Sequence, residues 1–351
     1  MTVSQKTRPG NYFEDFRVGQ EIHHATPRTI TAGDVAVYNS LFGPRFAVHS
    51  ADTFARHLGL ERSPIDDLLA FHMVFGKTVP DVSLNAIANL GYADGRFGAL
   101  LYVGDTVTTT SVVTGVKQNS NGKTGVVYVR STGTNQRGEM AVQYDRWVMV
   151  RKRDPSAPAP EVVVPELPTA VAPKTFNVPY AVLPSYDDSL AGSEHRFDDY
   201  EVGEKIDHID GMTIEEADHM AACRLFQNTA KVHFNLHTER EGRFQKRIVY
   251  GGYVISLARA LSFNGLANAQ TLAAINGGRH TAPSFAGDTI YAWSEVIEKH
   301  ALEAHPTVGA LRLRTVATKN RRCHDFPLMG ADGKYLPEVV LDFDYTVLMP
   351  R

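Results

Sequence analysis

FEDFRVGQEI at residues 13–22 is repeated as FDDYEVGEKI at residues 197–206, an offset of 184 residues. The same offset carries His49 onto His233, and further along the chain it slips by one residue. An offset this constant over roughly 95 positions indicates that one supersecondary unit has been duplicated. The fold is therefore expected to consist of two similar halves.

A proline-rich segment separates the two copies. Residues 154–174 read DPSAPAPEVVVPELPTAVAPK and contain six prolines. Proline lacks an N–H donor and fixes φ, so such a stretch favours an extended linker over a helix or an inner strand. The sequence predicts an N-terminal unit (1–153), a linker (154–190) and a C-terminal unit (191–351).

Each unit carries one long apolar segment followed by alternating runs. DDLLAFHMVFGKT (66–78) and GGYVISLARALSF (251–263) have the length and apolar density of buried helices. The β-branched, alternating runs that follow indicate antiparallel strands, and Asn121-Gly122 between two of them is typical of a hairpin turn. These patterns predict an α+β protein with one long helix and one strand meander in each unit.

Two Thr-x-x-acid motifs, at 31–34 and 213–216, predict helix N-termini. Asp34 and Asp218 would then lie in a first helical turn, where a carboxylate interacts favourably with the helix dipole. We interpret both aspartates as structural.

Composition excludes several classes of protein. The 351 residues include 36 Lys and Arg against 39 Asp and Glu, so no positive excess favours nucleic acid as a partner. No apolar run reaches about 18 residues, which argues against a membrane span. The N-terminus has no apolar leader, and Cys223 and Cys323 are too few for a disulfide framework. We therefore expect a cytoplasmic protein with two free thiols.

A long helix followed by antiparallel strands with a Gly-Asp-Thr turn resembles the hotdog fold, and the duplication resembles the double-hotdog members of the MaoC-like branch. Several stretches are similar to mesaconyl-CoA hydratases (β-methylmalyl-CoA dehydratases): FHMVFGKTVPDVSLNAIANLGYA, NSNGKTGVVYVRS, RWVMVRKRD, NTAKVHF and ARALSFNGLANAQ. This resemblance implies a hydro-lyase that reversibly hydrates a branched C5 dicarboxyl-CoA. It also implies an acyl-CoA thioester as partner and no cofactor.

The resemblance also indicates which copy carries the chemistry. MaoC-like hydratases hold a water with an Asp and a His five residues later, and a Gly N–H at the start of the long helix faces the thioester oxygen. The second copy has Asn228, His233 and Gly251 at these positions, whereas the first has Pro44 and Leu68 in place of the acid and the glycine. We predict that the second copy is catalytic and that the first shapes the acyl-CoA pocket.

Asn228 departs from the family pattern, because an amide cannot act as a general base near neutral pH. We expect His233 to take the proton from water while Asn228 fixes that water by hydrogen bonds. An imidazole acting alone would give an acidic limb near its ordinary pKa of about 6.5. The alternative is that Asn228 is a buried amide that satisfies backbone groups.

A dicarboxyl substrate also needs a cation for its free carboxylate. Lys231 and Arg279 are candidates for this role, and the alternative for each is an ordinary surface or pairing cation. His233 and His237 have an i,i+4 spacing, but without a third evident ligand we predict no metal. His72 lies in an apolar helix and is predicted to be a core residue.

Two other functions remain open on the sequence alone. A hotdog thioesterase would use a carboxylate near a long helix, and Asp66 and Asp67 offer one in the first copy. A non-catalytic acyl-CoA-binding protein is favoured by the Asn at position 228. The fused pair could be a self-sufficient pseudo-dimer or could assemble into a homo-oligomer.

Overall fold

In the computed structural model, which describes residues 6–351, ten antiparallel strands form one sheet. The N-terminal unit contributes β1 (Glu21–Thr29), β2 (Ala86–Phe97), β3 (Thr106–Gln118), β4 (Thr124–Thr134) and β5 (Met140–Arg151). The C-terminal unit contributes β6 (Lys205–Thr213), β7 (Thr271–His280), β8 (Thr289–Ala301), β9 (Val308–Lys319) and β10 (Val339–Pro350).

The strand order shows the duplication directly. It runs β1-β3-β4-β5-β2-β7-β10-β9-β8-β6, which is the same order read outward from the central β2–β7 pair. In that pair Tyr92 lies opposite Gly278 and Arg96 opposite Ala274. The two units therefore share one sheet, joined antiparallel at its middle.

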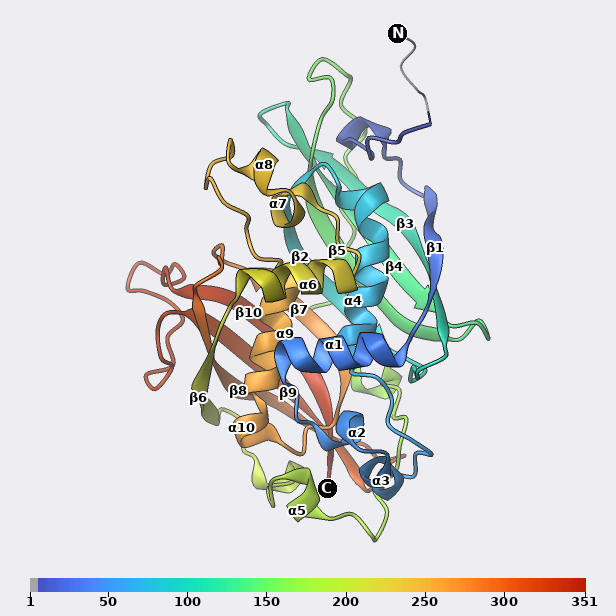
Figure 1. Ribbon diagram of the computed structural model, residues 1–351, viewed down its shortest axis with the longest axis vertical. Coiled ribbons are helices and arrows are strands. Elements are labelled where there is room, and N and C mark those ends of the chain that lie inside the picture. Colours follow the sequence, from blue (N-terminus) through green and yellow to red (C-terminus); the bar gives the residue numbers. More distant parts are fainter. Residues whose placement is uncertain (1–5) are drawn as a thin grey trace.

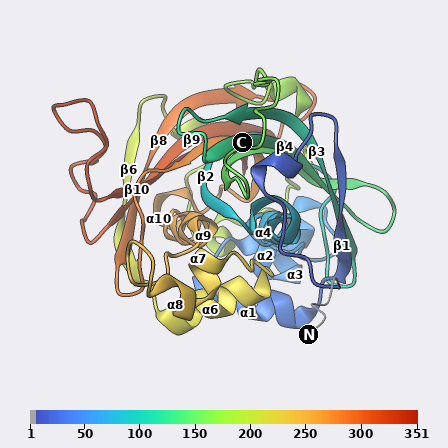
Figure 2. The same ribbon diagram turned by 90° about the horizontal axis from the view of Figure 1, so that it is seen from above.

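Two long helices pack side by side on the concave face of this sheet (Figure 2). They are α4 (Asp67–Thr78) and α9 (Gly251–Leu261), and almost every residue in both is buried. On the open side of the curved sheet, α1 (Ala32–Phe42) and α6 (Glu216–Leu225) run past each other (Figure 1). This arrangement confirms the predicted α+β class, with each long helix wrapped by an antiparallel sheet in the manner of a double hotdog.

Shorter elements complete the fold. The short α-helices are α2 (Ala47–Ser50), α3 (Asp52–Ala55), α5 (Asp188–Ala191), α7 (Lys231–Phe234), α8 (Leu236–Glu239) and α10 (Phe263–Leu266). Single turns of other helix types are η1 (Phe13–Asp15), η2 (Arg56–Leu58), η3 (Val79–Ser83), η4 (Pro173–Thr175) and η5 (Phe197–Asp199). Among the described residues, no helix combines the length and apolarity needed to cross a bilayer.

The helix starts bear out one of the two predicted caps. Thr31 caps α1 and forms a reciprocal capping box with Asp34, which confirms that motif. At 213–216 a helix does begin, at Glu216, but Thr213 is not its cap: Thr213 is the last residue of β6, and the N-cap of α6 is Glu215, with no side-chain cap bond. The repeat explains the difference, since the 184-residue offset places Glu215, not Thr213, on Thr31. Asp218 still lies in the first turn of α6, as expected.

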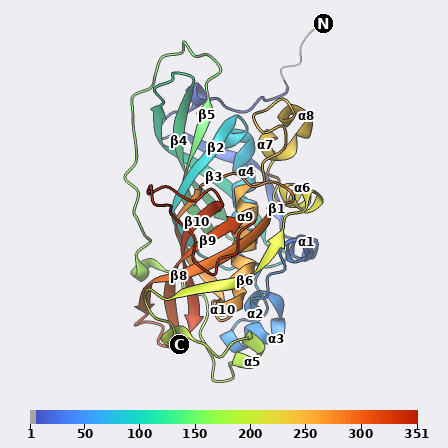
Figure 3. The same cartoon turned by 90° about the vertical axis from the view of Figure 1, so that its left-hand side faces the viewer.

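The predicted linker is largely without regular structure and runs along the outer side of the sheet (Figure 3). Its later part packs against the protein: Tyr180 and Tyr186 join a cluster with α2, α3 and the start of β9. The linker thus reaches both units. The predicted hairpin at Asn121-Gly122 is also present, with Gly122 at a φ of +64°.

Candidate active site

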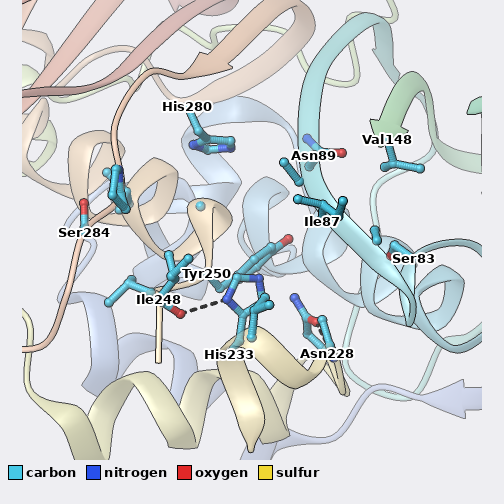
Figure 4. Close-up of a pocket in the computed structure, with 18 of the residues that line it drawn as sticks. Ser83, Ile87, Asn89, Val148, Asn228, His233, Ile248, Tyr250, His280 and Ser284 are labelled. Carbon is cyan, nitrogen blue, oxygen red and sulfur yellow. Dashed lines mark hydrogen bonds between the residues drawn. The ribbon is translucent and has the colours of Figure 1, made fainter. Parts of the chain in front are cut away.

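A cavity of about 260 Å³ lies between the two units. The N-terminal unit supplies one wall from the end of α4, from η3 and from strands β2 and β5. The C-terminal unit supplies the other from the segment around α7, the start of α9 and the end of β7 (Figure 4). The cavity brings together all three residues assigned to the reaction from the sequence, namely Asn228, His233 and Gly251.

His233 is held with one ring nitrogen available to the cavity. Its Nδ1 lies 2.8 Å from the carbonyl oxygen of Ile248 (Figure 4). A carbonyl can only accept, so Nδ1 carries the proton and donates, which leaves the lone pair of the neutral ring on Nε2. The Ile248 N–H in turn donates to the Val232 carbonyl at 3.0 Å, which ties the two segments together. The fold therefore fixes the tautomer that a general base at Nε2 requires.

Burial lowers the pKa of His233 to about 4, against the opposing effect of its bond to Ile248. The ring is therefore neutral near pH 7. An acidic limb caused by His233 would therefore lie near pH 4, below the 6.5 expected from an unperturbed imidazole.

Asn228 presents its amide nitrogen to the same cavity. It is 1% exposed, and its Oδ1 accepts the Ala230 N–H at 3.2 Å. Because the oxygen is used by this backbone donor, the Nδ2 donors are left for the cavity, and the nitrogen is turned toward His233 (Figure 4). Asn228 can thus donate to the oxygen of a water, whereas an Asp would accept from it.

A close helix contact positions Asn228. The turn after α6 places Gln227 at a φ of +55°, and a Cβ on Gly76 of α4 would lie 1.6 Å from the Phe226 carbonyl oxygen. Only a glycine lets α4 and this turn approach so closely. Lys77 of α4 adds a bond to Gln227 Oε1 at 2.5 Å.

Gly251 begins α9, where the first N–H groups of a helix have no intrahelical partner and the dipole is positive. A Cβ on Gly251 would lie 2.4 Å from His280 Cε1, so the absent side chain lets His280 approach the helix start. Behind the helix start, His219 Nε2 accepts the Tyr250 N–H at 3.0 Å. The site can therefore offer an oxyanion a backbone donor and a positive helix end.

Neither cation candidate from the sequence lies in the cavity. Lys231 is exposed at the start of α7, outside the cavity lining. Arg279 is exposed on the opposite face of β7, in a hollow it shares with Arg314 and Asp342. Successive residues of a strand point to opposite faces, so His280 enters the cavity and Arg279 points away from it.

The equivalent region of the first unit is filled. His49 Nε2 lies 3.6 Å from Asp67, whose carboxylate also accepts the Leu272 N–H at 2.7 Å. Burial opposes protonation of His49, but the carboxylates of Asp67 and Asp66 raise its pKa above the usual value. The space beside Asp67 is only about 20 Å³, enough for about one water, and linker residues Asn177 and Pro179 form part of its wall.

The remaining candidates have structural partners. His72 is fully buried, and its Nε2 lies 2.9 Å from Ser256 Oγ, which confirms it as a core residue. Asp66 accepts the Leu68 N–H at the start of α4. His237 is exposed, and within residues 6–351 no three His, Cys, Asp or Glu side chains are placed to hold a metal ion.

Sequence reasoning missed several polar residues of the cavity wall, including His280 and Arg146. The repeat contained a signal for the first, because the 183-residue offset places Phe97 at the position of His280. The signal for the second was strand alternation, because Arg146 falls on the same face as Tyr144 and Val148, which are buried.

Comparison with known proteins shows the family to which the chain belongs. A sequence profile described as mesaconyl-CoA hydratase matches residues 2–327. The chain is 69% identical over 350 residues to a β-methylmalyl-CoA dehydratase of Chloroflexus aurantiacus, covering 99% of both chains. It is 56% identical over 347 residues to a mesaconyl-CoA hydratase of Cereibacter sphaeroides, covering 99% of this chain and 100% of the relative.

Solved structures with the same fold are also found. A MaoC domain protein dehydratase from Chloroflexus aurantiacus superposes with a TM-score of 0.98 at 69% identity, over 99% of both chains. A Mycobacterium tuberculosis protein described as a double hotdog fold superposes with a TM-score of 0.75 at 23% identity, over 98% of this chain and 99% of that one. The second likeness shows the fold alone.

Proposed function

The chain belongs to the mesaconyl-CoA hydratase family, and we propose that it adds water reversibly to the double bond of mesaconyl-CoA to give β-methylmalyl-CoA. It is a hydro-lyase. The names of the two relatives described above give this reaction in opposite directions, one as a dehydration and one as a hydration.

The first step is activation of a water between two side chains. Asn228 Nδ2 donates to one lone pair of the water oxygen, and His233 Nε2 accepts one of its protons. The other lone pair of the oxygen then attacks the β-carbon of the enoyl thioester. Asn228 contributes position rather than basicity, because an amide has no proton-accepting role at this pH.

The second step is protonation of the α-carbon. Attack at the β-carbon moves an electron pair through the former double bond and places negative charge on the thioester oxygen. The Gly251 N–H and the positive end of α9 stabilise that charge. The imidazolium of His233 then returns its proton to the α-carbon, and its low pKa makes it a strong donor for this transfer. Dehydration follows the same steps in reverse.

The observation that carries this proposal is the bond from His233 Nδ1 to the Ile248 carbonyl. It leaves the basic nitrogen of a neutral ring available to the cavity that also holds the Asn228 amide and the start of α9. A structural histidine would have both nitrogens satisfied by the protein, as His72 does.

The proposed division of labour follows from the same geometry. We assign the acid–base groups to the C-terminal unit (191–351) and the shaping of the pocket to the N-terminal unit (1–153). The filled region around His49 supports this assignment, because it has no room for an acyl group. The buried free thiols of Cys223 and Cys323 fit the reducing cytoplasm that we propose as its compartment.

The test is an assay of enoyl-CoA thioesters, with mesaconyl-CoA beside crotonyl-CoA. We expect loss of the enoyl-thioester absorbance without release of free CoA thiol, and faster turnover of mesaconyl-CoA. Release of thiol would identify a thioesterase, and binding of thioester without turnover would identify a non-catalytic binding protein. Comparable kcat/KM for the two thioesters would contradict the dicarboxylate assignment.

A further inference from the structure

Arg146 is a buried cation in the wall of the cavity. It lies on β5 opposite Tyr92 of β2 and is 1% exposed. Its guanidinium stacks over the Phe75 ring at 4.3 Å, and Nη2 donates to Thr78 Oγ1 at 2.7 Å. These contacts hold the guanidinium plane at the end of α4, where it lines the cavity together with Ser83.

Arg146 has hydrogen-bond partners but no ion-pair partner among the residues that the structure describes. Among residues 6–351, no carboxylate oxygen lies within 4.0 Å of its nitrogens, and its buried Nε has no hydrogen-bond acceptor. Several arginines on the outer face of the sheet are paired with carboxylates, including Arg130 with Asp145 and Arg312 with Asp344. An isolated buried charge is unfavourable to the fold, so Arg146 needs an anion from outside the chain.

A neighbouring amide is unsatisfied in the same way. Asn89 lies on β2, next to the strand of Arg146, and lines the same cavity (Figure 4). Both its Nδ2 and its Oδ1 are buried without a hydrogen-bond partner. A guanidinium and an amide donor directed at one space form the kind of site that binds a planar carboxylate.

We propose that Arg146, assisted by Asn89, binds the free carboxylate of the substrate and so selects dicarboxyl over simple enoyl thioesters. This inference rests on the proposed function. Mesaconate is a methyl-substituted butenedioate, so a thioester at one carboxyl leaves the other carboxylate on the β-carbon. That carbon is the one attacked by water, and its carboxylate must therefore lie in the cavity that holds Asn228 and His233.

The location distinguishes Arg146 from the cations that the sequence suggested. Arg279 lies on the far face of β7 and Lys231 is exposed on α7, so neither can reach a carboxylate next to the reacting carbon without a rearrangement of its element. Arg146 needs no such rearrangement.

The experiment measures kcat/KM for mesaconyl-CoA and crotonyl-CoA in the wild type, Arg146→Met and Arg146→Lys, with Arg279→Met as the matched control. We expect the mesaconyl-to-crotonyl ratio to fall at least 100-fold in Arg146→Met. It should fall at least tenfold in Arg146→Lys, which keeps the charge but not the planar fork, and stay within threefold of the wild type in Arg279→Met. Thermal unfolding of Arg146→Met should occur at or above the wild-type Tm, because the variant removes an unpaired buried charge.

An unchanged ratio in either Arg146 variant overturns the inference. A parallel loss on both thioesters together with a lower Tm also overturns it, because that pattern describes a structural arginine. A wild type that hydrates neither thioester refutes the proposed function instead, and the two failures are thus told apart by the wild-type measurement.

Discussion

Replacing Asn228 by Asp places a carboxylate beside the proposed base without changing the shape of the side chain. One oxygen would still accept the Ala230 N–H, and the other would face the cavity on the side of His233. An anion within about 4–6 Å raises the pKa of an imidazole by about 1–3 units. The pKa of His233 would therefore rise from about 4 to about 5–7.

The direction of the change in activity follows from the protonation state of His233 that is active. Hydration needs neutral His233, so activity is full above its pKa and is lost as the pH falls through it. At pH 5 an imidazole of pKa about 4 is about 91% neutral, whereas one of pKa about 6 is about 9% neutral, so relative activity falls about tenfold. The difference should vanish by about pH 8, where both forms are neutral.

The assay is the pH profile of kcat/KM for mesaconyl-CoA hydration, in the wild type and Asn228→Asp. Asn235→Asp serves as the control, since it adds the same charge at the exposed cap of the neighbouring α8. An acidic limb in Asn228→Asp that coincides with the wild type, or lies at lower pH, would refute the assignment of His233 as the titrating base beside Asn228.

Two glycine substitutions test the packing that builds the site. Gly251→Ala should lower kcat about 100-fold or more, because its Cβ would lie 2.4 Å from His280 and displace the oxyanion donor; steady-state kinetics below the Tm of the variant is the measurement. Gly76→Ala should destabilise the protein by about 1–3 kcal/mol, seen as a lower denaturant midpoint, because its Cβ would lie 1.6 Å from the Phe226 carbonyl oxygen. Gly33→Ala, in the first turn of α1, is the control, because its Cβ would meet only Thr31 Oγ1 at 3.5 Å. This variant should leave kcat and the denaturant midpoint near the wild-type values. An equal effect at all three glycines would contradict both predictions.

The repeat made most of the fold predictable. Because one offset relates the two copies, each helix or strand was supported twice, and the turns recur with the same bonds. The Ile30 N–H donates to the Asp105 carbonyl at 2.8 Å, and Ile214 donates to Asp288 at 2.9 Å. The repeat could not predict how the two units pair. The pairing of β2 with β7 brings together two segments that no local sequence pattern connects.

The sequence predicted some residues of the site correctly and others not. His233, Asn228 and Gly251 follow from the family resemblance, applied to each copy in turn, and all three line one cavity. The cation for the free carboxylate of the substrate was not predicted correctly, because charge alone pointed to Arg279 and Lys231. A cation that is close to the site in sequence can still face away from it in the fold. Arg146 lies on the other unit's strand, and only the packing of the two units brings it to the cavity.

The most direct test of the account compares the two equivalent histidines in one assay. His233→Ala and His49→Ala remove the same side chain from the two copies, and kcat for mesaconyl-CoA hydration is measured for each. Because His233, unlike His49, presents a ring nitrogen to an open cavity, His233→Ala should lower kcat by about 10²–10⁴-fold, while His49→Ala should retain most of the wild-type activity at a temperature where it is folded. Equal losses in the two folded variants, or a larger loss in His49→Ala, would contradict the claim that the second copy alone carries out the reaction.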